Sequence, residues 1–138
     1  MLEIILNIIV AYNDLKYRKI HNITNLIIYS YGLILVVVMK DTILTHPRQV
    51  LEFVLVNCFV LTFYWKGQIG AGDVKCIFSY SMINATKGID LVNWFLMINI
   101  VTILMFITFL YLNEKENRRG LPYGVSIALI NLIFILEQ

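Results

Sequence analysis

The chain has 138 residues, of which 59% are hydrophobic and 14% charged, and its formal net charge is +2. This length suits one domain, and so apolar a composition excludes an ordinary soluble domain, whose helices keep a polar face. There is no basic patch of the kind that binds nucleic acid, so no nucleic-acid partner is expected.

Three long runs contain no Asp, Glu, Lys or Arg: residues 20–39, 91–113 and 120–136. A helix that crosses a bilayer needs about 20 mostly apolar residues. We therefore predict an all-α polytopic membrane protein, a single domain over residues 1–138 with the lipid bilayer as a partner. Its six transmembrane helices are expected at roughly 1–16, 22–40, 49–65, 70–87, 90–112 and 121–137.

The first span carries Glu3, Asn7 and Asp14 near one helix face, because their spacings are 4 and 7. No basic segment precedes its apolar run, and no small-residue cleavage site follows it. We therefore expect a first transmembrane helix rather than a removable signal peptide. Two helix starts have capping residues: Asn22 is predicted to cap the second span, and Asp90 the fifth.

In the fourth span, the residues Asp73, Cys76, Tyr80 and Asn84 recur at helical spacing and form one stripe. We expect this stripe to face the interior of the bundle. Asparagines within the spans are expected to hydrogen-bond between helices. They are Asn7, Asn57, Asn84, Asn99 and Asn131.

Orientation follows from the loop charges, because cytoplasmic loops carry the excess of Lys and Arg. One set of loops holds Lys16, Arg18, Lys19, Lys66, Lys75, Lys115, Arg118 and Arg119, and the other holds Lys40, Arg48 and Lys87. The first set is therefore predicted to be cytoplasmic. Asp14 and Asp73 then both fall on the cytoplasmic side.

Asp14 and Asp73 are the two candidate catalytic residues, since a carboxylate at membrane depth is costly without a function. Two facing carboxylates share one proton. The ionised one can take a proton from water while the protonated one donates to a carbonyl oxygen, which supports attack of water on a peptide bond. No metal and no cofactor are expected.

The stretch "GAGDVK" (70–75) leads into Asp73. Gly70 and Gly72 allow a tight or unwound entry to the helix and close approach of another backbone. Lys75 is two residues from Asp73, so it points to another side of the helix. It is expected to anchor the helix end at the headgroups by snorkelling, or to bind an acidic group.

Three segments together resemble the type IV prepilin peptidases and the related archaeal preflagellin peptidases. "GAGDVK" looks like the family's second catalytic motif, and "DLKYRKIHN" (14–22), which ends at Asn22, looks like its first. "LPYGVSIAL" (121–129) is similar to the family's Pro-Tyr-Gly segment, here Pro122, Tyr123 and Gly124, which opens the last helix in its first turn.

The resemblance implies an intramembrane aspartyl protease in which Asp14 and Asp73 are catalytic. The family cleaves the short basic leader from type IV pilin-like precursors at the cytoplasmic membrane face, so such a precursor is the expected protein partner. The chain looks like the short form found with tight-adherence-type systems. His21 stands where the family usually has Pro, and it is expected to be a solvated turn residue rather than a proton relay.

Three alternative functions share some of these sequence features. A small proton- or ion-coupled transporter would use Asp14 and Asp73 as a relay, but no inverted repeat is present. A presenilin-like enzyme would need Tyr-Asp on the helix before Gly-x-Gly-Asp, where Glu52 is the last acidic residue. A non-catalytic homologue is suggested by His21 alone. We therefore favour the prepilin peptidase.

Overall fold

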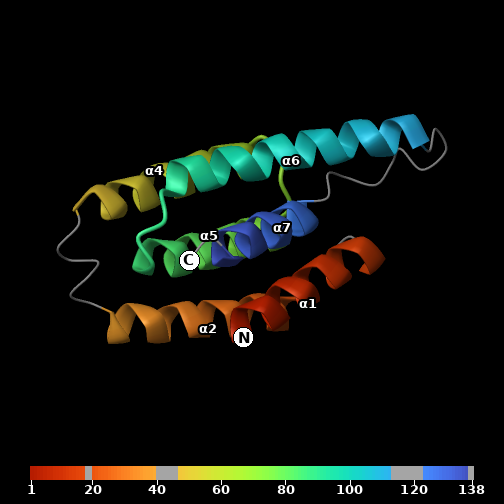
Figure 1. The fold of residues 1–138 in the computed structure, drawn as a ribbon. Coiled ribbons are helices and arrows are strands. Elements are labelled where there is room, and N and C mark those ends of the chain that lie inside the picture. The colour runs from red at the N-terminus through yellow and green to blue at the C-terminus, as the bar shows by residue number, and fades with distance from the viewer. Residues whose placement is uncertain (18–19, 40–46, 113–122, 137–138) are drawn as a thin grey trace. The chain divides into compact units, whose positions relative to one another are not determined.

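The computed structural model describes residues 1–17, 20–39, 47–112 and 123–136, the last four residues of the third range by their backbone alone. These residues form helices and short connecting turns and include no strand (Figure 1). The helices are α1 (Leu2–Tyr17), α2 (Asn22–Val38), α4 (Pro47–Trp65), α5 (Ala71–Thr86), α6 (Leu91–Leu112) and α7 (Tyr123–Leu136). The predicted all-α fold is confirmed, and each predicted span corresponds to one helix.

Among the described residues, one helix is long and apolar enough to cross a membrane: α6, over Leu91–Thr108. α2 and α7 are apolar but shorter. At 1.5 Å per residue, a helix of 16 residues such as α1 falls short of a hydrocarbon core about 30 Å thick. Six membrane-crossing helices therefore remain a prediction.

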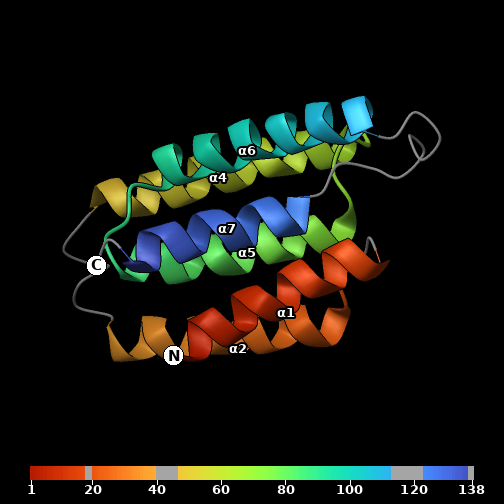
Figure 2. The same ribbon diagram turned by 45° about the vertical axis from the view of Figure 1, so that its right-hand side comes forward.

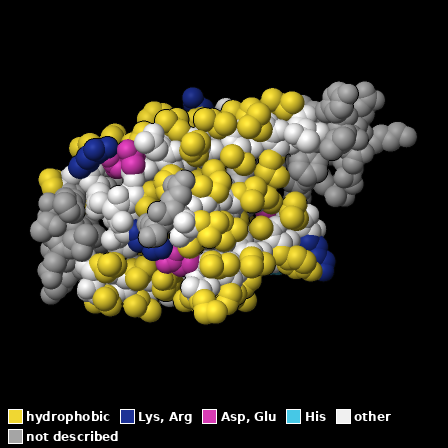
Figure 3. All heavy atoms as spheres, in the orientation of Figure 1, with side chains coloured by type: hydrophobic (Ala, Val, Ile, Leu, Met, Phe, Trp, Pro, Cys, Tyr) yellow, Lys and Arg dark blue, Asp and Glu magenta, His cyan; other side chains and the backbone are white. Residues whose placement is uncertain are grey.

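Large apolar side chains remain exposed along several helices. On α2 the exposed ones include Ile23, Ile34 and Val37, and on α4 they include Leu51 and Phe59. Figure 3 shows hydrophobic side chains over much of the visible surface, with few charged ones between them. A surface with this much contiguous apolar area is typical of contact with lipid or with another protein.

The chain divides into two compact units. Met1–Ile20 and Leu96–Gln138 form the first, and His21–Phe95 forms the second. In the first unit, α1 packs against α7. In the second unit, α5 packs against both α2 and α4 (Figure 2).

Hydrogen bonds and close contacts fix the directions of the helices in the second unit. The start of α2 meets the start of α5, since Asn25 Nδ2 donates to the carbonyl oxygen of Gly72 over 3.1 Å. Further along both helices, Gly32 of α2 lies beside Ser79 and Ile83 of α5, so the two helices run parallel. α4 runs antiparallel to α5, and Asn57 Nδ2 near its middle donates to Ser81 Oγ over 3.1 Å. This bond confirms the interhelical role predicted for Asn57.

Asn7 does not make the interhelical hydrogen bond that was expected of the asparagines within the spans. It is fully buried, yet neither of its amide atoms hydrogen-bonds a described residue. The interhelical bond predicted for Asn7 is therefore wrong, because burial on the helix face does not by itself bring a polar partner within reach.

Two glycines end helices in the second unit. Gly67 follows α4 and Gly88 follows α5, both with positive φ (70° and 75°). After each, the next N–H bonds back into the helix: Gln68 to the carbonyl of Phe63, and Ile89 to that of Asn84. This pattern satisfies carbonyls that the helix end would otherwise leave unpaired. It places the short turns on either side of α5.

One predicted cap is confirmed and one is wrong. Asp90 Oδ1 accepts the N–H of Asn93 over 3.0 Å and caps α6. The residue that caps α2 is His21, which makes no side-chain cap bond, and Asn22 is already helical. The Asn22 side chain instead accepts a hydrogen bond from Lys75, so the tertiary contact takes the oxygen that a cap would have used.

A charged cluster joins α4 to the start of α6. Glu52 is 6% exposed and accepts hydrogen bonds from Arg48 Nε over 2.7 Å and from the N–H of Leu91 over 3.0 Å. Arg48 also pairs with Asp90 over 3.2 Å. Because Glu52 satisfies an otherwise unpaired N–H in the first turn of α6, it acts as a second cap from a neighbouring helix.

We predict that Glu52→Ala lowers the free energy of unfolding by about 1–3 kcal/mol, because it leaves the buried N–H of Leu91 without an acceptor. Glu52→Gln keeps an acceptor oxygen at this position, so its free energy of unfolding should fall by less than that of Glu52→Ala. Thermal unfolding of the purified protein in detergent measures both. Equal stability of the two variants and the wild type would contradict this role.

Candidate functional site

Asp14 lies near the end of α1 and is 4% exposed. Its Oδ2 accepts the backbone N–H of Val125 over 3.0 Å. Val125 is in the first turn of α7, where N–H groups have no partner within the helix and the helix dipole favours negative charge. The carboxylate of Asp14 therefore caps α7 from α1.

Gly124 makes this contact possible. A Cβ atom at this position would lie 2.8 Å from Cβ and 3.0 Å from Cγ of Asp14. Contacts this short force a neighbour to move, and here the neighbour is the base of the Asp14 side chain rather than a flexible tip. The glycine is required for close approach of α7 to Asp14, whatever its backbone angles.

Tyr123 fixes the start of α7 on its other side. Its hydroxyl donates to Oδ1 of Asn99 on α6 over 2.7 Å, and its ring is buried. The predicted interhelical role of Asn99 is thereby confirmed. Two residues of the Pro-Tyr-Gly segment thus have contacts that hold α7 around Asp14, while Pro122 lies outside the described residues.

In the second unit, Asp73 occupies the first turn of α5 and is partly buried. Gly70 is the N-cap residue, with φ −74° and ψ 151°. A Cβ at Gly70 would lie 3.1 Å from Oδ2 of Asp73. This glycine therefore leaves room for the carboxylate, and regular helix begins at Ala71, so the unwound entry that the two glycines suggested is not observed.

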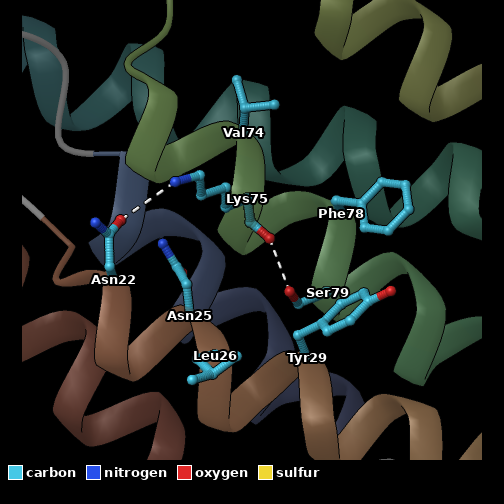
Figure 4. A pocket seen from close by; sticks show the side chains of 8 residues that line it. All are labelled: Asn22, Asn25, Leu26, Tyr29, Val74, Lys75, Phe78 and Ser79. Atoms are coloured by element: carbon cyan, nitrogen blue, oxygen red, sulfur yellow. Dashed lines mark hydrogen bonds between the residues drawn. The ribbon is translucent and has the colours of Figure 1, made fainter.

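Side chains from α2 hold the same turn. Asn25 donates to the carbonyl of Gly72 over 3.1 Å. Figure 4 shows the second bond, in which Lys75 Nζ donates to Oδ1 of Asn22 over 3.3 Å. Sequence reasoning missed Asn25. Its spacing of three from Asn22 indicates a shared helix face, but the sequence does not show that this face meets the Gly-x-Gly-Asp turn.

His21 adopts the conformation that proline would impose. Its φ is −66° and its ψ 142°, and proline fixes φ near −65°. The side chain is exposed, as predicted. The departure from the usual proline therefore leaves the turn into α2 in the same backbone geometry.

The remaining stripe residues of α5 are buried: Cys76, Tyr80 and Asn84. The predicted inward face of this helix is confirmed.

The described residues contain no group of three or more His, Cys, Asp or Glu side chains that could hold a metal ion. Asp14 belongs to the first unit and Asp73 to the second, and each carboxylate is described in its own unit.

Residues 1–113 match the type IV leader peptidase family. This stretch includes both Asp14 and Asp73 and ends before α7. No curated protein and no solved structure matches the chain. The match favours a peptidase over the transporter alternative.

We predict that Gly124→Ala lowers the free energy of unfolding by about 1–3 kcal/mol, because the added Cβ displaces Asp14 and lengthens its bond to Val125. Thermal unfolding in detergent measures the loss.

Asp14→Gly supplies the matched control, since it removes the side chain that the new methyl group meets. In the double variant the two losses should not add, with an interaction energy of about 0.5–3 kcal/mol. Simple additivity would show that Gly124 is needed for some other reason.

Proposed function

The chain belongs to the type IV leader peptidase family, and we propose that it is an aspartic endopeptidase that removes the basic leader from pilin-like precursors. In this proposal Asp14 and Asp73 are the catalytic residues, and cleavage takes place at the cytoplasmic face of the membrane. The family is membrane-associated, and α6 is long and apolar enough to span a bilayer.

The burial and fixed orientation of Asp14 are the observation that carries the proposal. A carboxylate this buried is costly unless its surroundings compensate it, and here a backbone N–H and the open Cα of Gly124 are arranged around it. A residue needed only to cap α7 could be Ser, Thr or Asn. General acid–base chemistry explains why a carboxylate stands there.

The second carboxylate, Asp73, is supported by its local geometry. Gly70 leaves space beside its Oδ2, and Asn25 fixes the carbonyl of Gly72 one residue before it. A catalytic group has to be held by its neighbours in a productive orientation. The bond of Asp14 to Val125 and the held backbone before Asp73 support this proposal, each within its own unit.

The proposed reaction needs no covalent intermediate. The ionised aspartate takes a proton from water as the water oxygen attacks the scissile carbonyl carbon. The protonated aspartate donates its proton to the carbonyl oxygen, which gives a tetrahedral intermediate. The aspartate that took the proton from water then gives it to the amide nitrogen, and the other aspartate takes back a hydroxyl proton of the intermediate. The C–N bond breaks, the carboxyl and amine products leave, and the pair again holds one proton.

The cytoplasmic orientation rests on the loop charges. Eight of the 11 Lys and Arg residues fall in the loops on the side of Asp14 and Asp73. Five of these eight, Arg18, Lys19, Lys115, Arg118 and Arg119, lie outside the described residues. A precursor whose basic leader stays in the cytoplasm would meet the two aspartates on this side.

We predict that Asp14→Asn and Asp73→Asn each reduce cleavage of a co-expressed precursor by about 10²–10⁴-fold, since each removes one proton-transfer group. The double variant should be no less active than either single variant, because groups that act as a unit are not additive. Immunoblotting separates the precursor from its shortened product.

Asp90→Asn is the matched control. Asp90 is also an aspartate at a helix start, but it caps α6, and asparagine caps nearly as well. This variant should process the precursor normally. Normal processing by Asp14→Asn or Asp73→Asn in membranes that contain the protein would refute the mechanism.

We further predict that cleavage by the purified enzyme is unchanged by a chelator, because the proposed acid–base pair does not use a metal ion. The rate is measured with and without excess chelator on the same precursor. Strong inhibition that added divalent metal reverses would count against the two-aspartate mechanism.

A further inference from the structure

A groove lies between α2 and α5 in the second unit, with a volume of about 410 Å³ (Figure 4). It is lined by Asn22, Asn25, Leu26, Tyr29, Val74, Lys75, Phe78 and Ser79. We propose that this groove binds a phospholipid with an anionic headgroup, its phosphate on Lys75 and one acyl chain along the apolar wall. The proposal does not rest on the peptidase activity proposed above, although Asn25 lines the groove and also bonds the turn before Asp73.

The wall of the groove is apolar along its length. Leu26 is 63% exposed, and the rings of Tyr29 and Phe78 lie with their centroids 6.3 Å apart. The polar residues of the wall use their donors on backbone: Ser79 Oγ donates to the carbonyl of Lys75 over 2.8 Å, and Asn25 Nδ2 donates to that of Gly72. An alkyl chain is therefore the complementary occupant of this part of the groove.

The mouth of the groove carries a positive charge. Lys75 is exposed, and Asn22 is its one protein partner among the described residues, at 3.3 Å. An ammonium group has three donors, so two remain for a phosphate. Lys75 also lies near the start of α5, where a membrane-spanning helix would meet the headgroups.

Charge distinguishes this occupant from the precursor. The basic leader expected for the substrate would be repelled by Lys75, whereas an anionic headgroup is attracted. The groove also lies on another face of α5 from Asp73, because residues two apart in a helix point to different sides. Lipid in the groove would therefore leave the Asp73 face uncovered.

Native mass spectrometry of the full chain tests the proposal with phosphatidylglycerol and phosphatidylcholine of identical acyl chains. The wild type should retain more phosphatidylglycerol. Lys75→Gln should reduce retention of phosphatidylglycerol about fivefold, the scale of one basic residue at a headgroup, and leave phosphatidylcholine unchanged. Lys66→Gln is the matched control, since Lys66 is an exposed lysine outside the groove.

The apolar half of the site has its own pair of variants. Leu26→Trp should fill the groove and reduce retention of both lipids, whereas Ile34→Trp, on an equally exposed position of α2 outside the groove, should not. Equal effects of Lys75→Gln and Lys66→Gln, or of Leu26→Trp and Ile34→Trp, would overturn the proposal.

A labelling experiment on the unmodified chain makes the result independent of how the variants fold. Phosphatidylglycerol with a photoreactive acyl chain should label Leu26, Tyr29 or Phe78 in preference to other exposed apolar residues. Labelling spread evenly over all the exposed apolar residues, inside and outside the groove, would refute the site. Loss of groove labelling on addition of the precursor, with the precursor cross-linked there instead, would assign the groove to the substrate and also refute it.

Discussion

In a chain this apolar, each polar group inside a helix bundle has to find its partner within the protein. Most do so locally: Thr86 Oγ1 donates to the carbonyl of Ile83, and Thr102 Oγ1 to that of Ile98. In these bonds the hydroxyl group donates within its own helix, so it does not link one helix to another. Three long-range bonds, those of Asp14, Asn25 and Glu52, instead join a side chain to the backbone of another helix, and they help to define how the helices in each unit meet.

These three long-range bonds have the same geometry. In each, a side chain from one helix pairs with a backbone group near the start of another: Asp14 and Glu52 accept N–H groups, and Asn25 donates to a carbonyl. A helix start leaves N–H groups without a partner in the helix, and Asp14 and Glu52 supply acceptors for two of them. The carbonyl of Gly72 has two lone pairs, so it can accept from Asn25 as well as within the helix. The same arrangement that stabilises the fold therefore fixes the turns that carry Asp14 and Asp73, so stability and site geometry depend on the same few polar residues.

Much of this fold was predictable from the sequence, because apolar runs and turn residues are local signals. The six helices, the cap by Asp90 and the buried stripe of α5 follow from spacing alone. The roles of Gly124 and Asn25 could not be predicted, because they depend on which residues a distant helix brings close. The Asn22 cap was wrong for the same reason, since its oxygen bonds Lys75. The catalytic roles of Asp14 and Asp73 remain predictions from the sequence.

The bond between Asp14 and Val125 joins residues 111 positions apart. The second unit is continuous in sequence, whereas the first combines the two ends of the chain. During synthesis, α2, α4 and α5 are complete long before α7 emerges from the ribosome. Asp14 therefore acquires its N–H partner only after the 111 residues that follow it have been made, and α7 gives this carboxylate its orientation late in the synthesis of the two units.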